Sequence, residues 1–127
     1  MLSNVNLYLE ENFAKNLDSV KFIVVIPEQG CGTCITQAEN FYNEFSQNDD
    51  IVFVFCNIIS NKILKHKVNI NYDNTVFDYD NEFLSLLPQN KHIYPCVFVM
   101  KNGKASALIW QSVRQAAFME IRKSINH

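Results

Sequence analysis

The chain has 127 residues, of which 48% are hydrophobic, and this is enough to fill the core of one ordinary domain. Lys and Arg number 11 against 13 Asp and Glu, the net charge is -2, and no block of like charge occurs, which disfavours binding to nucleic acid or an anionic membrane. The longest apolar runs, residues 22–27 and 51–56, are far shorter than the roughly 20 residues of a membrane-spanning helix. We therefore expect a single domain over residues 1–127, without a membrane span.

The N-terminus shows no signal-peptide pattern. Residues 1–5 contain no basic region followed by an apolar stretch and a small-residue cleavage site. A cytoplasmic protein has this pattern, and so does a domain of the cell envelope or periplasm whose signal has been removed. Four cysteines in this length are also fewer than a disulfide-stapled secreted scaffold carries. The compartment therefore stays open at this point.

Hydrophobic periodicity divides the first half of the chain into a helix, a strand, a second helix and a second strand. The first helix is predicted from apolar residues at four-residue spacing, which are Val5, Leu9, Phe13 and Leu17. Residues 20–26 are β-branched and almost continuously apolar, as in a strand covered on both sides, and residues 51–56 repeat this pattern. Between them, residues 35–45 carry an apolar helical face. This order predicts two parallel strands joined by a right-handed crossover.

The second half begins with a less regular segment. Helices near residues 59–64 and 81–87 and a strand at residues 75–78 predict a helix-strand-helix insert. Beyond it, residues 96–100 and 105–110 predict two strands joined at Asn102-Gly103, a turn that needs positive φ. The last helix is predicted from its inward positions, which are Val113, Ala117, Ile121 and Ile125. The whole order predicts an α/β fold with a central mixed sheet and helices on both faces, extended by an N-terminal helix.

The motif Cys31-Gly32-Thr33-Cys34 lies where the first central strand gives way to a helix. Cysteines at this spacing come close enough to form a disulfide, and Cys31 faces the unpaired N–H groups of the first helical turn. These N–H groups and the helix dipole stabilise a thiolate, which predicts Cys31 as the reactive sulfur and Cys34 as its shielded partner. Gly32 and Thr33 tune the pair through local geometry and add no charge.

Two other interpretations of the cysteines remain open. A CxxC motif is also half of a zinc site, although Cys56 and Cys96 are isolated and no histidines show paired spacing among His66, His92 and His127. The motif is also compatible with two structural thiols, although buried structural cysteines usually lie inside apolar runs. Cys56 ends such a run and is predicted to be an unreactive packed thiol.

The chain resembles the thioredoxin superfamily in two separated segments. Residues 22–26, followed by the CxxC motif at a helix start, are similar to the family's redox motif. Residues 93–104, Ile-Tyr-Pro-Cys-Val-Phe-Val-Met-Lys-Asn-Gly-Lys, resemble its proline-strand-hairpin segment. The two segments together are much more specific than CxxC alone, and the resemblance covers most of the chain except residues 58–90, which match as a loose insert. It implies a thioredoxin fold and disulfide exchange.

The resemblance also implies where a substrate binds. It implies a cis peptide bond before Pro95, a form found in roughly 5% of X-Pro bonds, and places the backbone of Tyr94 beside Cys31. An extended substrate segment would pair with Tyr94 there as a short added strand. Without the CxxC motif, Pro95 would be interpreted as an ordinary proline at the start of a strand.

Three features depart from the family pattern. Gln29 and Gly30 precede the first cysteine where the family often has a tryptophan, so the substrate contacts differ. Val25 stands where many thioredoxins have a buried acid; Glu28 is a substitute, but we expect an exposed loop residue because acids are rarely buried without a partner. Cys96 directly follows the proline, and we expect a small apolar filler there rather than a third exchanging thiol.

These features predict a thiol-disulfide oxidoreductase similar to the divergent thioredoxin-like proteins of bacterial cell envelopes, whose partners include membrane-linked electron donors and apo-cytochromes. Cys31 is the predicted nucleophile, Cys34 the resolving thiol, and Tyr94 and Pro95 position the substrate. The partners are protein disulfides or dithiols and a redox partner protein, and no metal or organic cofactor is needed. The alternative is a redox-idle thioredoxin-fold module that grips a partner protein beside Pro95. The direction of exchange stays open, because CxxC proteins span roughly -270 to -120 mV.

Overall fold

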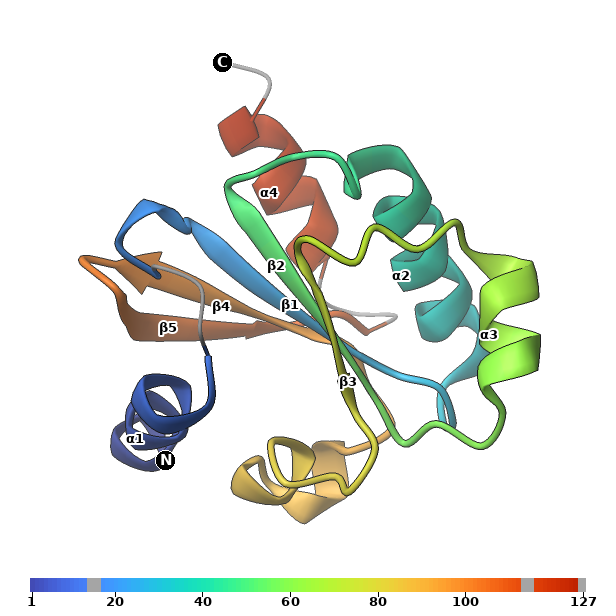
Figure 1. Cartoon of the computed structure of the whole chain (residues 1–127), viewed down its shortest axis with the longest axis horizontal. Coiled ribbons are helices and arrows are strands. Elements are labelled where there is room, and N and C mark those ends of the chain that lie inside the picture. The colour runs from blue at the N-terminus through green and yellow to red at the C-terminus, as the bar shows by residue number, and fades with distance from the viewer. Residues whose placement is uncertain (14–16, 113–115, 126–127) are drawn as a thin grey trace.

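The computed structural model describes residues 1–13, 17–112 and 116–125. Two positions named above, Val113 and His127, lie outside the described residues. The described strands form one five-stranded sheet in the order β3-β2-β1-β4-β5 (Figure 1). The strand bounds are β1 Phe22–Pro27, β2 Ile51–Cys56, β3 Thr75–Asp78, β4 Cys96–Lys101 and β5 Lys104–Trp110. The α-helices are α1 Leu2–Asn12, α2 Gly32–Phe45, α3 Asn61–Lys67 and α4 Ala117–Ile125.

The sheet is mixed, as the sequence predicts. Strand β1 pairs in parallel with β2, which pairs in parallel with β3. On its other side β1 pairs antiparallel with β4, and β4 and β5 form an antiparallel hairpin. The hairpin turn has positive φ at Asn102 (54°) and Gly103 (80°), which confirms the predicted turn.

Helices cover both faces of the sheet (Figure 1). Side chains alternate along each strand, so Ile23 and Val25 of β1 join a core that includes α1, whereas Val24 and Ile26 join one that includes α2, α3 and α4. All six residues of β1 and of β2 are buried. Burial on both faces explains why these strands have continuous apolar sequences rather than alternating ones.

The N-terminal helix is shorter than its periodicity predicts. It ends at Asn12, and Phe13 has an extended backbone with φ -101° and ψ 118°. Phe13 and Leu17 still pack against the same core as Val5 and Leu9. Their apolar spacing therefore reflects burial on one face of the sheet, which a chain leaving a helix also achieves.

The insert differs from the prediction in its last element. Helix α3 and strand β3 are found, but the segment before Pro88 contains a short 3-10 helix, Leu84–Leu86, in place of an α-helix, and another follows at Gln89–Lys91. The buried carboxylate of Asp78 accepts the N–H groups of Glu82, Phe83 and Leu84 at 3.0 to 3.2 Å. A capped turn that Pro88 stops is too short to propagate as an α-helix.

No helix among the described residues is long and apolar enough to cross a membrane. The turn between β1 and α2 lies at the carboxyl ends of the parallel strands, where β1 lies between β2 and the antiparallel strand β4. Residues 28 to 31 are therefore flanked by the loop that follows β2 and by the segment that precedes β4.

Candidate active site

Cys31 and Cys34 form a disulfide at the start of α2. Cys31 is the N-cap residue of the helix, and its Sγ accepts a hydrogen bond from the Cys34 N–H at 3.3 Å. The sulfur thus takes the place of the oxygen that usually caps a helix N-terminus. Cys31 is partly exposed, whereas Cys34 has no exposed surface. A substrate approaching from solvent therefore meets Cys31 first.

Gly30 lets the chain pass directly over the segment that precedes β4. Its φ is 139°, and a Cβ at this position would lie 2.5 Å from the Cα of Ile93. The next residue, Cys31, donates its N–H to the carbonyl oxygen of Ile93 at 2.9 Å. This contact brings the cysteine motif and the Tyr94-Pro95 segment together, although they are far apart in the sequence.

The cis peptide bond predicted before Pro95 is not found, since no peptide bond among the described residues is cis. The trans form of an X-Pro bond is favoured by about 0.5–1 kcal/mol unless the surroundings select the other form. Here the trans segment satisfies its backbone locally, because the Tyr94 N–H donates to the carbonyl of Lys91 at 3.0 Å. The carbonyl of Pro95 accepts the N–H of Gln111 at 2.8 Å.

These hydrogen bonds also correct the expected substrate contact at Tyr94. Its N–H is occupied by the turn from Lys91, and the Lys91 ammonium lies 5.7 Å from the centre of the Tyr94 ring. A substrate strand that pairs with this N–H must first displace it from the Lys91 carbonyl. The neighbouring Ile93 leaves 46% of its surface exposed and offers an apolar contact beside Cys31.

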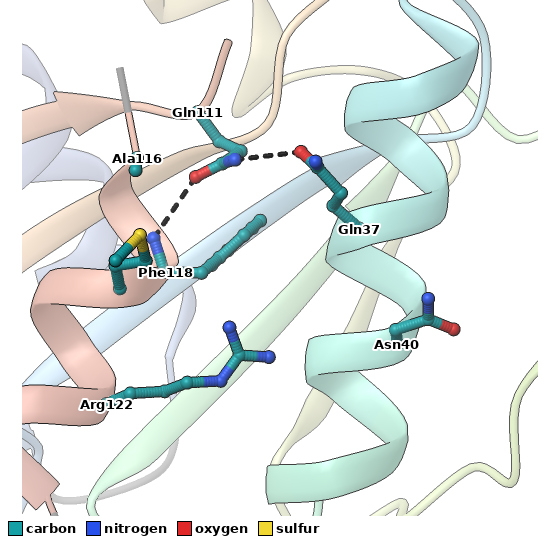
Figure 2. Close-up of a pocket in the computed structure, with 7 residues that line it drawn as sticks. Gln37, Asn40, Gln111, Ala116, Phe118 and Arg122 are labelled. Carbon is teal, nitrogen blue, oxygen red and sulfur yellow. Dashed lines mark hydrogen bonds between the residues drawn. The ribbon is translucent and has the colours of Figure 1, made fainter. Parts of the chain in front are cut away.

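A polar pocket of about 240 Å³ lies between α2 and α4 (Figure 2). Buried Gln111, which holds the Pro95 carbonyl, donates to Gln37 Oε1 at 2.9 Å and accepts the N–H of Phe118 at 3.1 Å. Arg122 closes the far end and pairs with Glu44 at 3.0 Å. Gln111 therefore connects the segment beside the cysteines to both helices that cover this face.

The missing tryptophan is replaced by a polar contact. Gln29 donates from Nε2 to the backbone oxygen of Asn57 at 3.1 Å and to its side-chain oxygen at 3.0 Å. Asn57 follows β2 and has a φ of 52°. This pair of hydrogen bonds connects the cysteine turn to the loop after β2, and no motif in the sequence indicates it.

Glu28 is not an exposed loop residue, contrary to the expectation from the sequence. Only 7% of its side chain is exposed, and its carboxyl group lies beside those of Glu39 and Lys67. Burial, followed by the charge and hydrogen bond of Glu39, raises the pKa of Glu28 to about 7, whereas Lys67 opposes this rise. Val25, at the position of the family's acid, is a buried core residue. The one signal that sequence reasoning missed is Glu39, an acid on the apolar face of α2.

The remaining cysteines, Cys56 and Cys96, are free and fully buried. Burial raises the pKa of the Cys56 thiol, with smaller contributions from Asp78 and Glu28, and burial raises the pKa of Cys96 with a contribution from Cys56. Both thiols are therefore protonated at neutral pH. Among the described residues, no group of three or more His, Cys, Asp and Glu side chains is placed to hold a metal ion.

Because a thiolate is the reactive form, we expect Cys56 and Cys96 to resist alkylation in the reduced native protein, whereas Cys31 is modified rapidly. Mass spectrometry of peptides after a short treatment with N-ethylmaleimide measures this order. We also expect Cys96→Ser to leave the redox midpoint of the protein unchanged. Labelling of Cys96 as fast as Cys31 would show that it belongs to the exchanging site.

The fold and the cysteine pair define a thioredoxin-fold protein with a disulfide at the N-terminus of the helix after its first central strand. The chain matches no protein-family model and no curated protein. A candidate thioredoxin from Neisseria meningitidis is similar to it, with a TM-score of 0.53, 13% identity, and coverage of 87% of this chain and 75% of that one. A secreted disulfide oxidoreductase of Mycobacterium tuberculosis, homologous to E. coli DsbE, matches with a TM-score of 0.49, 14% identity, and coverage of 84% and 81%. The similarity to the Neisseria structure confirms the predicted thioredoxin fold.

Proposed function

We propose that this protein is a thiol-disulfide oxidoreductase that exchanges disulfides with protein substrates. The observation that carries the proposal is the Cys31–Cys34 disulfide at a helix N-terminus, with one sulfur reachable from solvent and the other buried. An exposed nucleophile with a shielded second thiol is the arrangement that exchange through a mixed disulfide requires. The thioredoxin fold is consistent with this chemistry and does not identify the substrate.

In the proposed reaction, the Cys31 thiolate attacks a substrate disulfide and forms a mixed disulfide, and one substrate sulfur leaves as a thiolate. Cys34 then attacks Cys31, so that the second substrate sulfur leaves and the Cys31–Cys34 disulfide forms. The reverse sequence oxidises a substrate dithiol. The first turn of α2 favours the Cys31 thiolate through its N–H groups and dipole.

The neighbouring residues have supporting roles in this proposal. Ile93, Tyr94 and Pro95 form the surface that an extended substrate contacts, because the Cys31 N–H is hydrogen-bonded to this segment. Gly32 and Thr33 are exposed and lie between the two sulfurs, so they tune the pair through backbone geometry. A separate redox partner protein would restore the starting state of the pair after each turnover.

A redox titration tests the proposal. The protein is equilibrated in glutathione or dithiothreitol buffers, quenched with acid and alkylated, and its disulfides are located by mass spectrometry. We expect one reversible Cys31–Cys34 disulfide, and its midpoint decides between a reductant and an oxidant. If this disulfide does not exchange at any poise, the proposal is wrong and the redox-idle binding module becomes the better interpretation.

A further inference from the structure

Two buried carboxyl groups, those of Glu28 and Glu39, meet beside the cysteine pair. Glu28 follows β1, Glu39 lies on α2, and Lys67 from the end of α3 approaches both. The exposed fractions of the two glutamate side chains are 7% and 12%. The Lys67 ammonium lies 4.0 Å from Glu28 and 3.6 Å from Glu39, so one positive charge faces two acids.

The hydrogen bonding of these carboxyl groups is incomplete if both are ionised. The Oε2 atoms of Glu28 and of Glu39 are buried, and neither has a hydrogen-bond partner among the described residues. An ionised carboxylate only accepts hydrogen bonds, so two of them cannot satisfy each other. The two groups lie close enough for a side-chain hydrogen bond. A single proton held between them makes one group a donor and removes both the repulsion and the missing partner.

The other ionisable group near the pair, on the sheet side, is Cys56 of β2. Its carbonyl accepts the Glu28 N–H at 2.9 Å. Its thiol is buried, and its raised pKa keeps it uncharged at neutral pH. The charge balance at the pair is therefore set by Glu28, Glu39 and the partly exposed Lys67. With one proton on the pair, the remaining carboxylate and the ammonium compensate each other.

The pair is close to the cysteine that most needs a proton carrier. Cys34 has no exposed surface, so bulk water does not reach its sulfur directly. Glu39 lies on the same helix a little more than one turn further along, about 7 Å along the axis. Glu28 lies just before Cys31 on the other side of the motif. One bridging water spans a separation of this order.

We propose that the Glu28–Glu39 pair stores one proton, gives it to Cys34 when the disulfide is reduced, and takes it back when Cys34 attacks the mixed disulfide. This inference rests on the proposed function and assigns the proton acceptor that Val25 cannot be. The pair stands on different elements from that position, since it joins the loop after β1 to α2 and α3.

The proposed steps balance as follows in the direction of reduction. A substrate thiolate attacks Cys31, the Cys31–Cys34 bond breaks, and its electron pair goes to Cys34 Sγ, which takes the stored proton. In the release step, Cys34 returns this proton to the ionised pair and its electron pair forms the bond to Cys31. The bond from Cys31 to the substrate breaks, and the substrate sulfur leaves as a thiolate.

The direction of the pH effect follows from these steps. The pair accepts a proton from Cys34 only when both carboxyls are ionised, which occurs as the pH rises through about 7. The release step therefore accelerates with rising pH in this range. Reduction of the disulfide has the opposite dependence, because it needs the protonated pair.

The reaction of the reduced protein with 5,5′-dithiobis(2-nitrobenzoate) separates the two thiols. Cys31 attacks the reagent in a first phase and releases one coloured thiolate, and Cys34 releases the second in a later phase. We expect Glu28→Gln to slow the second phase by about 100-fold above pH 7 and to remove its rise through this range. The first phase should keep the wild-type rate, because it does not involve the Cys34 proton.

Glu44→Gln is the matched control. Glu44 lies on the same helix, but 54% of its side chain is exposed and it pairs with Arg122 instead. It should leave both phases unchanged. Lys67→Met provides a second variant that keeps both acids: removing the ammonium that lowers the pKa of Glu28 should move the midpoint of the second phase to higher pH.

Carboxyl 13C NMR of the wild-type protein tests the shared proton without reference to activity. We expect one proton to leave the pair near pH 7, and we expect the Glu28 midpoint to fall in Glu39→Gln together with the midpoint of the second phase. Full ionisation of both carboxyls at pH 5, or a second phase unaltered in Glu28→Gln, would overturn the inference. Absence of both phases in the wild-type protein would instead overturn the proposed function.

Discussion

Cys34→Ser should accumulate a mixed disulfide on Cys31, and Cys31→Ser should lose disulfide exchange completely. The two sulfurs have different surroundings, since Cys31 is partly exposed at the helix N-terminus and Cys34 is fully buried. Without Cys34 the intermediate has no internal thiol to resolve it, whereas without Cys31 no thiolate reaches the substrate. Intact-mass spectrometry after reaction with an oxidised protein substrate measures both results.

Cys96→Ser is the control for this pair, because it removes a buried thiol outside the Cys31–Cys34 disulfide. It should exchange at the wild-type rate and form no stable adduct. The assignment of roles would be contradicted if Cys31→Ser formed the stable adduct and Cys34→Ser turned over normally.

Gly30→Ala should disrupt the contact between the cysteine turn and the segment before β4. At a φ of 139° an L-residue is strained by about 1–3 kcal/mol, and its Cβ would also collide with the Ile93 backbone at 2.5 Å. Ile93 must then move, and the hydrogen bond from the Cys31 N–H to its carbonyl is weakened or lost. We expect a lower free energy of unfolding in urea and faster hydrogen exchange at the Cys31 amide.

Gly32→Ala separates this effect from the loss of any glycine near the motif. Nothing lies within 4 Å of a Cβ at Gly32, and the residue is the first of α2. Alanine is favoured over glycine in helices by up to about 1 kcal/mol, so we expect unchanged or slightly higher stability. Equal stability of Gly30→Ala and the wild-type protein would show that the Gly30–Ile93 approach is not required.

The departures from the thioredoxin pattern have structural counterparts that differ in kind. The place of the aromatic rim is taken by Gln29, whose amide joins the cysteine turn to the loop after β2. The acid missing at Val25 has its counterpart in Glu28, which reaches the same region from the loop rather than from the strand. The chemistry near Cys34 is therefore open to a proton carrier although the strand position is apolar.

Local patterns determined most of the architecture. Strand β2 has the predicted bounds, because six consecutive apolar and mostly β-branched or aromatic residues fit only a strand buried on both faces. The Asn102-Gly103 turn was equally clear, since only a few residue types adopt positive φ readily. The start of α2 at the CxxC motif follows from a glycine-containing turn before an apolar helical face. These features depend on neighbours in the sequence.

Tertiary packing decided the rest. The 3-10 turn before Pro88 depends on Asp78, whose carboxylate caps N–H groups that follow it in the chain. The Tyr94 N–H is engaged by Lys91, so a resemblance that implied an open backbone did not predict its state. Glu28 is buried because α2 and α3 bring Glu39 and Lys67 to it, and no spacing in the sequence records that meeting. The sequence by itself determined the strands, the helices and the reactive cysteine pair, whereas the partners of buried polar groups were decided only when distant segments packed together, because their energies depend on burial and on contacts across the fold.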